Sequence, residues 1–513
     1  MDILKNLLCF SIPAGTVFCV CSRLSKQQVI RLLENVSYSY AEAQTGSLHN
    51  ITLHIRKGEC ILLCGASGCG KTTLTRLING LIPHFFPGKL SGEIRVDGRN
   101  TITTEIAALS DIVGTVFQNP RMQFFNTDTD SELVFGLENR SVPREQMKER
   151  LRELTEDLHL EHLRGRSIFA LSGGEKQKIA FSSVCASDPK ILVLDEPSSN
   201  LDTAAIEELA ELIAKVKSEG KTIIISEHRL WYLMNLADRV VFLRDGVLEK
   251  DFPTADFCSL PSDEIEAMGL RCRDLKEIIV RESPVSLTEN YLDVKNLRVH
   301  LGKECILKDL SFSARGGEII AIAGANGAGK TTLARALCGL QKESSGSIIL
   351  GGERLSSKKR KQCSYMVMQD VGQQLFTDSI WEECRLGIQK PDTAQIEYAL
   401  NLLGLSQYKD RHPLSLSGGQ KQRLAVAVSL ICKRKLLVFD EPTSGLDLSG
   451  MKEVGRLAKE LSLHGSILLI VTHDVEFMKH ICSRILVLSE GKITADLSGE
   501  ARETVEQILR GEI

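Results

Sequence analysis

The sequence predicts an α/β protein that consists of two tandem copies of one domain, each with a mainly parallel sheet. The first observation is an internal repeat: GASGCGKTTL at residues 65–74 recurs as GANGAGKTTL at 324–333, and further motifs recur in the same order. The second is the alternation of short apolar, β-branched runs with segments of helical periodicity, which is typical of parallel sheets covered by helices. The length of 513 residues allows roughly two to four domains.

The repeated motifs keep the same spacing in both halves. Ser172 precedes Asp195 by 23 residues, as Ser417 precedes Asp440, and each Asp precedes a His by 33 residues. A repeat of about 250 residues indicates a duplicated domain rather than a solenoid. We therefore expect an N-terminal extension at 1–28, a first domain at 29–252, a linker at 253–288 and a second domain at 289–513.

Apolar runs in each half end where a ligand would meet the carboxyl edge of a parallel sheet. One run precedes a glycine-rich turn, one precedes an acidic pair, and one precedes a histidine. Helical spacing and helix-forming composition predict helices at 203–218 and 451–461. The expected strands are 60–64, 191–194 and 223–225 in the first half, and 319–323, 436–439 and 467–471 in the second.

The composition is that of an ordinary globular chain. Hydrophobic residues make up 43% and charged residues 25%, which argues against a wholly disordered chain. The formal net charge of −3 gives no overall attraction to nucleic acid, although a local basic patch remains an alternative. The 15 cysteines include no CxxC pair, so we expect free thiols in a reducing cytosol.

No apolar run reaches the roughly 18 residues that a membrane-spanning helix needs. The nearest run, residues 7–21, is interrupted by Ser11, Pro13 and Gly15 and resembles a weak signal-peptide core without a cleavage site. We expect residues 1–28 to be an unstructured extension or to reflect a start placed too early. If the protein acts at a membrane, a partner must supply the membrane-spanning part.

The glycine-rich turn of each half matches the pattern G-x4-G-K-T, which is typical of a phosphate-binding loop (P-loop). Backbone N–H groups of such a turn can surround phosphate oxygens, the lysine can contact the β- and γ-phosphates, and the first threonine offers a hydroxyl to Mg²⁺. A chance glycine-rich turn is the alternative, and the second copy weakens it. The expected nucleotide-binding residues are Gly65, Ala66, Ser67, Gly68, Cys69, Gly70, Lys71, Thr72 and Thr73, and Gly324, Ala325, Asn326, Gly327, Ala328, Gly329, Lys330, Thr331 and Thr332.

Cys69 lies inside the first of these turns. We expect it to be a small filler between glycines. If its thiol is accessible instead, alkylation blocks ATP binding at the first site, and added ATP protects it.

An acidic pair closes the second apolar run of each half. Asp195 and Asp440 can hold the Mg²⁺ shell together with Thr72 and Thr331. The carboxylates that follow, Glu196 and Glu441, can orient and polarise an attacking water. Two surface acids at a strand end are the alternative, which the recurrence in both halves weakens.

Two neutral polar residues recur as well. Gln118 and Gln369 can complete a magnesium shell or touch the water, although a lone glutamine is usually only polar surface. His228 and His473 can contact the γ-phosphate and couple it to the water. A lone histidine is more often a satisfied core or surface residue, so the matched offset from the acids carries this interpretation.

A Ser-Gly-Gly element stands before a predicted helix in each half. A serine N-cap with free backbone N–H groups behind it makes an anion site, and ordinary helix capping is the alternative. The residues concerned are Ser172, Gly173 and Gly174, and Ser417, Gly418, Gly419 and Gln420.

The complete set of motifs resembles the nucleotide-binding domains of ABC ATPases, over roughly residues 29–252 and 289–500. The resemblance implies domains with a parallel sheet core, an antiparallel β part and a helical subdomain, which bind ATP and Mg²⁺ and pair head to tail within the chain. Each ATP would then lie between one P-loop and the Ser-Gly-Gly of the other domain. Lys71 would face Ser417, and Lys330 would face Ser172, with hydrolysis at both sites.

The resemblance also implies two unequal sites. Tyr40, 25 residues before Gly65, fits the position of an aromatic residue that stacks on adenine, whereas Leu301 stands opposite it in the second half. Glu175 replaces the usual glutamine after Ser-Gly-Gly. An extra carboxylate near the γ-phosphate could weaken the site that this element completes.

A narrower resemblance is to the ATPases of energy-coupling factor (ECF) importers. The segment FQNPRMQFF at 117–125 is similar to their glutamine-loop pattern, and residues 373–380 resemble it in the second half. This resemblance implies a peripheral protein at the cytoplasmic face of the membrane. Its partners would be a transmembrane coupling subunit and a substrate-binding membrane subunit, and its cargo a vitamin or a transition-metal ion.

Two alternatives remain open. One is the fused ATPase of another importer type, such as those for simple sugars, which tend to have a degenerate second site; Glu441 and His473 argue against this class. The other is a soluble tandem ABC ATPase that acts on ribosomes or DNA. The short linker and the near-neutral charge argue against this second class, and no nucleic-acid partner is expected.

Overall fold

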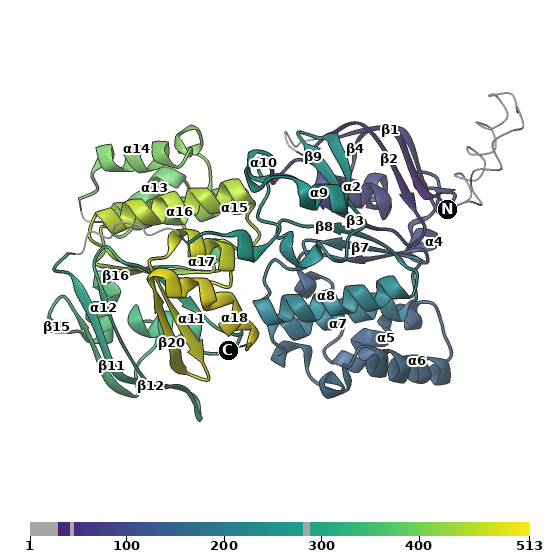
Figure 1. Ribbon diagram of the computed structural model, residues 1–513. Helices are drawn as coiled ribbons and strands as arrows, with labels where there is room; N and C mark the ends of the chain where they lie inside the picture. The colour runs from purple at the N-terminus through teal and green to yellow at the C-terminus, as the bar shows by residue number, and fades with distance from the viewer. Residues whose placement is uncertain (1–28, 42–45, 281–287, 389, 513) are drawn as a thin grey trace, which may run out of the picture.

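The computed structural model describes residues 29–41, 46–280, 288–388 and 390–512. Two domains of the same architecture lie side by side, the first on the right of Figure 1 and the second on the left. The expected extension at 1–28 and part of the expected linker, 281–287, lie outside the described residues.

The elements of the first domain and of the segment that follows it include all three strands expected there. The expected 60–64 strand is β3, and the expected helix 203–218 is α8. The strands are β1 (Val29–Tyr40), β2 (Leu48–Arg56), β3 (Cys60–Cys64), β4 (Gly88–Val96), β5 (Arg99–Asn100), β6 (Val113–Val116), β7 (Ile191–Asp195), β8 (Thr222–Ser226), β9 (Arg239–Arg244) and β10 (Val247–Pro253). The helices are α2 (Lys71–Ile78), α3 (Leu81–His84), α4 (Ile106–Ser110), α5 (Thr129–Asn139), α6 (Arg144–Asp157), α7 (Gly173–Ala186), α8 (Thr203–Ser218), α9 (Thr254–Ser259) and α10 (Ser262–Ala267), with the 3₁₀ turns η1 (Pro120–Met122), η2 (Glu161–Leu163), η3 (Ile168–Ala170), η4 (Trp231–Leu233) and η5 (Leu275–Glu277).

The second domain repeats this order. Its strands are β11 (Tyr291–Leu301), β12 (Glu304–Arg315), β13 (Ile319–Ala323), β14 (Ser345–Leu350), β15 (Glu353–Arg354), β16 (Ser364–Val367), β17 (Leu436–Asp440), β18 (Ile467–Val471), β19 (Arg484–Ser489) and β20 (Lys492–Ser498). Its helices are α11 (Lys330–Leu337), α12 (Ser357–Cys363), α13 (Ile380–Arg385), α14 (Thr393–Leu402), α15 (Gly418–Cys432), α16 (Leu448–Leu463), α17 (Val475–Ile481) and α18 (Val505–Arg510), with the 3₁₀ turns η6 (Val371–Gln374), η7 (Ser406–Tyr408), η8 (Pro413–Ser415) and η9 (Gly499–Thr504).

Each domain contains one parallel sheet and one antiparallel sheet. The strand order β10-β9-β3-β8-β7-β6 in the first domain matches β20-β19-β13-β18-β17-β16 in the second, with only the β9–β10 and β19–β20 pairs antiparallel. The smaller sheets, β2-β1-β4-β5 and β12-β11-β14-β15, are antiparallel. The predicted α/β class with a mainly parallel core and an antiparallel part is confirmed.

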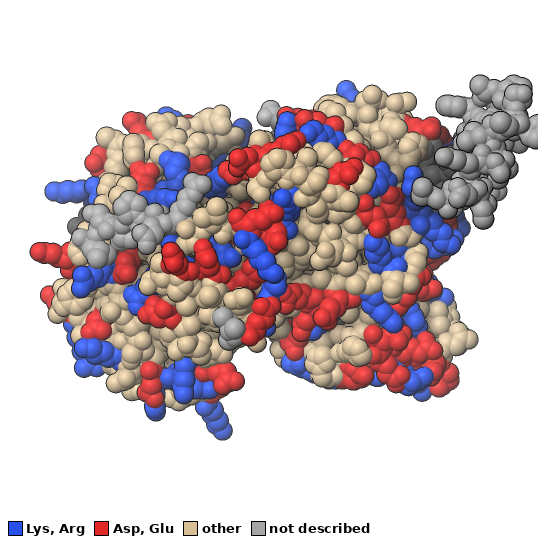
Figure 2. Space-filling view, in the orientation of Figure 1, with Lys and Arg blue, Asp and Glu red and all other residues tan. Residues whose placement is uncertain are grey.

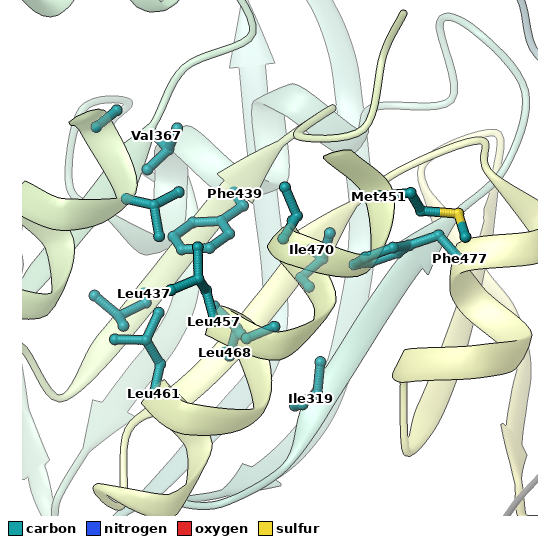
Figure 3. Packing of buried hydrophobic residues seen from close by; sticks show 14 of the residues in the cluster. Ile319, Val367, Leu437, Phe439, Met451, Leu457, Leu461, Leu468, Ile470 and Phe477 are labelled. Carbon is teal, nitrogen blue, oxygen red and sulfur yellow. The ribbon is translucent and has the colours of Figure 1, made fainter. Parts of the chain in front are cut away.

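The parallel strands are buried on both faces, as their unbroken apolar sequences predict. In the second domain, Leu437, Phe439, Leu468 and Ile470 pack against Leu457 of α16 in one continuous cluster (Figure 3). Phe439 is fully buried, and its replacement by alanine would cost about 3–5 kcal/mol in transfer and cavity terms. This core fixes the strand ends and therefore the side chains that follow them.

Residues 254–280 form a folded segment that packs on both domains. Phe257 and Ile265 are buried in the core of the first domain, and Leu275 and Ile278 in that of the second. Between them, Arg271 pairs with Asp474 at 2.5 Å and with Glu476. The segment expected to be a linker thus contributes buried side chains to both cores.

The carboxyl end of the chain returns to the first domain. Arg510 of α18 pairs with Glu207 of α8 at 2.7 Å, and its guanidinium lies 5.7 Å from the ring of Trp231. Figure 1 shows α18 and the C-terminus beside α8. The two domains are therefore joined by contacts of the segment that precedes the second domain and by contacts of the helix at its end.

The visible surface carries charges of both signs. Figure 2 shows acidic and basic side chains interspersed over this face of both domains. Within the described ranges, no helix has the length and apolar character needed to span a bilayer.

Candidate nucleotide sites

The two P-loops have the same backbone and lysine geometry. Gly65 and Gly324 have φ of +146° and +137°, and a Cβ on either would approach a strand carbonyl to 2.2 and 2.0 Å, so only glycine fits. The ammonium group of Lys71 donates to the carbonyls of Gly65 and Ala66 at 2.9 and 3.1 Å. Lys330 does the same to Gly324 and Ala325, at 2.8 Å each. In both loops the lysine ammonium group is thus held against the loop backbone, where a phosphate group would bind.

Oxygen donors suited to Mg²⁺ lie next to each loop. The hydroxyl of Thr72 donates to Asp195 at 3.3 Å, and that of Thr331 donates to Asp440 at 3.4 Å. Hydroxyl and carboxylate oxygens at a strand end are the ligand types that Mg²⁺ takes beside nucleotide phosphates. The residues present therefore fit the metal.

The glutamate that follows each aspartate has a left-handed backbone. Glu196 and Glu441 have φ of +47° and +52°, and their N–H groups donate to Ser226 and Val471 of the neighbouring strand at 2.8 Å. Such a conformation is costly for a side chain of this size, so the neighbouring strand enforces it. The result is a carboxylate turned away from the strand and into the site.

Each glutamate meets the predicted histidine. His228 Nε2 lies 3.3 Å from Glu196 Oε1, and His473 Nε2 lies 3.1 Å from Glu441 Oε1. In the first site Gln118 also donates to Glu196 at 2.6 Å. Gln369 lines the second cavity together with Glu441. The residues expected to act on the attacking water are therefore adjacent in both sites.

The acids of the two sites differ in their electrostatics. Burial alone would raise the pKa of Glu196, but the His228 hydrogen bond and the nearby charges of His228 and Lys71 lower it below its usual range. Burial raises the pKa of Glu441 to about 8, since the charge of Lys330 compensates only in part. Burial, with the charges of Lys330 and Arg229, holds the pKa of His473 well below its usual value.

An aspartate of each domain crosses to the P-loop of the other. Asp447 accepts from the backbone N–H of Ser67, and Asp202 accepts from that of Asn326, both at 2.7 Å. The second oxygen of each carboxylate caps its own helix, α16 or α8. Because each aspartate joins two domains, each site depends on the neighbouring domain.

The adenine sides of the two sites are unequal. A cavity of about 470 Å³ at the first P-loop includes Tyr40 and Phe86, and the Tyr40 hydroxyl bonds to Thr73 and Arg76. A cavity of about 240 Å³ at the second P-loop includes Leu301 and Ile306 instead. Tyr40 and Leu301 therefore lie where the sequence alignment of the two halves places them.

The two Ser-Gly-Gly elements are placed differently. A Cβ on Gly173 would lie 4.0 Å from the side-chain nitrogen of Asn326, in the second P-loop. A Cβ on Gly418 or Gly419 would meet nothing within 4 Å. The second site is thus approached by its expected opposite element, whereas Ser417 and its neighbours are not among the residues that line the first cavity.

Glu175 is occupied within its own domain. One carboxylate oxygen pairs with Arg166 at 2.7 Å, and the other accepts from the N–H of Ser172 at 2.7 Å in a capping box. Gln420 makes the same bond to Ser417. Because Arg166 balances its charge, Glu175 adds less negative potential to the second site than its sequence position suggests.

Sequence reasoning missed several residues of the sites. Arg229 lines the second cavity, together with Ser199, Asn200 and Ser444. The Ser444 hydroxyl donates to the Ser199 carbonyl at 2.7 Å across the domain interface. Ser199 and Ser444 each stand four residues after the strand-end aspartate, so the repeat could have revealed them. Asn200 and Arg229 could not be found in this way, because Gly445 and Asp474 stand at the matching positions.

Comparison with known proteins also indicates that the two domains bind nucleotide. The sequence model of the ABC transporter family matches residues 48–199 and 307–444, once in each domain. A Treponema denticola protein, provisionally named an ABC transporter ATP-binding protein, is 59% identical over 483 residues, covering 93% of this chain and 99% of its own. The chain belongs to the ABC transporter ATP-binding family. This tandem ABC ATPase binds ATP with Mg²⁺ and hydrolyses it.

Two further similarities are more distant. A Bacillus subtilis protein, provisionally named HMP/thiamine import ATP-binding protein YkoD, is 32% identical over 496 residues, covering 90% of each chain. An archaeal ribosome recycling factor, solved with a ribosomal stalk protein, is 21% identical with a TM-score of 0.63, covering 91% of this ATPase and 90% of that chain. The latter similarity is one of fold.

Proposed function

We propose that this ABC ATPase powers an importer of the ECF type, which takes up a vitamin or a transition-metal ion. The observation that carries the proposal is an apolar side chain presented at the surface of each domain, after the site glutamine. Phe125 and Phe376 are each 74% exposed. Single exposed apolar residues are common, but equivalent ones on buried polar supports indicate a docking surface.

A buried glutamate binds the backbone at both phenylalanines. The buried carboxylate of Glu132 accepts from the N–H groups of Phe125 and Asn126 at 3.0 and 2.8 Å. Glu383 accepts from those of Phe376 and Thr377 at 2.9 and 3.0 Å. A buried carboxylate needs such hydrogen bonds, and these bonds fix the backbone at the two phenylalanines.

The same loops are joined to the nucleotide sites. The side-chain oxygen of Gln123 accepts from the N–H of Phe117, one residue before Gln118. That of Gln374 accepts from the N–H of Met368, one residue before Gln369, at 2.8 Å. A partner seated on Phe125 or Phe376 would therefore move with the residues that face the water and the metal.

In the proposed cycle, ATP binding draws the two domains together, and hydrolysis releases them. Mg²⁺, when bound, neutralises charge on the phosphates. Lys71 and Lys330 contact phosphate oxygens, while Glu196 and Glu441 orient water under the hold of His228 and His473. The provisional name of the Bacillus subtilis relative favours a vitamin as the cargo. We place the protein at the cytoplasmic face of the membrane, bound to a transmembrane coupling subunit and a substrate-binding membrane subunit.

The test is a pull-down from detergent-solubilised membranes. The tagged bait carries Glu196→Gln and Glu441→Gln and is supplied with MgATP, so that bound ATP is retained. We expect one integral membrane subunit and one or more substrate-binding membrane proteins, and their identity gives the cargo. The same bait with Phe125→Ala and Phe376→Ala should lose them, while the two phenylalanine changes leave the ATPase activity of the otherwise unchanged protein intact. Recovery of ribosomes or of soluble proteins alone would refute the importer proposal.

A further inference from the structure

The residue after the site histidine differs between the two domains. The first domain has Glu227, His228 and Arg229 where the second has Thr472, His473 and Asp474. Arg229 is only 7% exposed. An arginine buried to this degree must direct its donors to specific acceptors, because desolvation of its charge is costly.

Arg229 directs these donors to the loop that crosses to the second site. Its Nη1 donates to the carbonyls of Ser198 and Leu201, both at 3.2 Å. These two carbonyls enclose Ser199 and Asn200, which line the second cavity. The next residue, Asp202, bonds to the second P-loop at Asn326. One guanidinium thus fixes the segment through which the first domain contacts the second P-loop.

The charge of Arg229 also faces the reacting groups of the second site. The side chain lines the cavity of about 240 Å³ that contains Lys330, Glu441 and His473. The first domain therefore contributes a positive charge to the second site.

Among the described residues that line the first cavity, none is a cation of the second domain. Asp474, at the matching position, caps α17 and pairs with Arg271 instead. The support behind the histidines differs in the same way. Glu227 accepts from Ser198, His228 and Tyr232, whereas Thr472 carries no charge, accepts from the N–H of Asp474 at 3.1 Å and shares a 3.5 Å contact with Thr443 on the matching loop. At these matching described positions, the buried glutamate before the histidine and the arginine after it occur in the first domain and not in the second.

We propose that Arg229 is a positioning residue of the second ATP site, supplied across the domain interface by the first domain. It holds residues 198–202 against the second P-loop and places a guanidinium beside Glu441 and His473. Because Arg229 directly follows His228, the histidine of the first site is one peptide bond from a group that orders the second. The inference rests on ATP hydrolysis and not on the importer proposal.

The experiment reads the two sites separately in one molecule. The full-length protein is trapped with orthovanadate during turnover of 8-azido-ATP, photolysed and digested, and the label is quantified on peptides of each domain. Arg229→Gln keeps hydrogen-bond donors but removes the charge, and Arg229→Lys keeps the charge but loses the fork. Arg152→Gln, on the exposed face of α6, is the matched control.

For Arg229→Gln we expect vanadate-dependent label on the second domain to fall at least about tenfold relative to the first, since small misplacements near reacting groups cost that much. Labelling without vanadate should give nucleotide affinities within about threefold of the parent protein at both sites. Arg229→Lys should recover part of the loss and carries the same test if Arg229→Gln fails to fold, and Arg152→Gln should change nothing. An unchanged ratio between the domains, or an equal loss in both, would overturn the proposal.

Discussion

Removal of the Arg271 guanidinium is expected to destabilise the second domain strongly. The side chain is 4% exposed, and it pairs at 2.5 and 2.7 Å with Asp474 and Glu476, which are 2% and 5% exposed. Arg271→Ala leaves two buried carboxylates without the guanidinium that pairs with both of them. Breaking a buried pair by removal of one partner typically costs about 3–5 kcal/mol, mostly through the uncompensated charge.

The assay is differential scanning calorimetry of the full chain without nucleotide. For a domain of this size, about 1 kcal/mol shifts the midpoint by about 2–4 °C, so the transition of the second domain should fall by roughly 6–20 °C. Lys452→Ala is the control, because Lys452 also joins this segment to the second domain, through Glu266, but both partners are more than half exposed. Its loss should cost less than about 1 kcal/mol.

A variant that removes all three charges separates the two contributions. Arg271→Met with Asp474→Asn and Glu476→Gln leaves none of these three groups charged and should recover most of the loss. If Arg271→Ala shifts the midpoint no more than Lys452→Ala does, the segment is not held by this cluster, and the reasoning fails.

Three further predictions concern the nucleotide sites. Glu196→Gln and Glu441→Gln should each leave partial, unequal turnover in a phosphate-release assay; complete loss from one change alone would contradict independent sites. Without nucleotide, the raised pKa of Glu441 means that the unfolded chain binds fewer protons between about pH 4.5 and 8, so stability falls as pH rises through that window. The free energy of unfolding of Glu441→Gln should therefore rise relative to that of the parent protein, by up to a few kcal/mol between pH 5 and pH 8. Glu196→Gln should not show this rise, because the pKa of Glu196 is lowered in the folded protein. A difference between Glu441→Gln and the parent that does not depend on pH would refute this. Iodoacetamide at pH 7 should modify exposed Cys258 well before Cys69, which is 5% exposed with its pKa raised by burial; rapid, ATP-protected loss of the Cys69 thiol would instead support an accessible site.

The sequence predicted the candidate site best where the reactive residues follow buried strands. The runs before Lys71, Asp195 and His228 are buried strands that end at one edge of a sheet, so their spacing sufficed to bring them together. Contacts within 3.3 Å between Thr72 and Asp195, and between Glu196 and His228, follow from that edge.

Contacts that depend on how loops turn or on how the two domains dock could not be predicted in the same way. The balance of Glu175 by Arg166 depends on how a loop turns nine residues earlier, and the reach of Arg229 depends on how two domains dock. Arg271, in the expected linker, is buried because its guanidinium pairs with Asp474, the N-cap of α17, and with Glu476 in the first turn of that helix. In each case a distant partner decides the role of the residue.

The crossing of Asp202 and Asp447 has a consequence for how such a protein can diverge. In a dimer of identical chains, every substitution appears twice, and whatever improves one composite site is imposed on the other. Here a single polypeptide supplies both halves, so a change such as Arg229 opposite Asp474 enters one site only. Duplication within one gene thus allows the two ATP sites to evolve different rates of hydrolysis, and this difference is inherited with the chain.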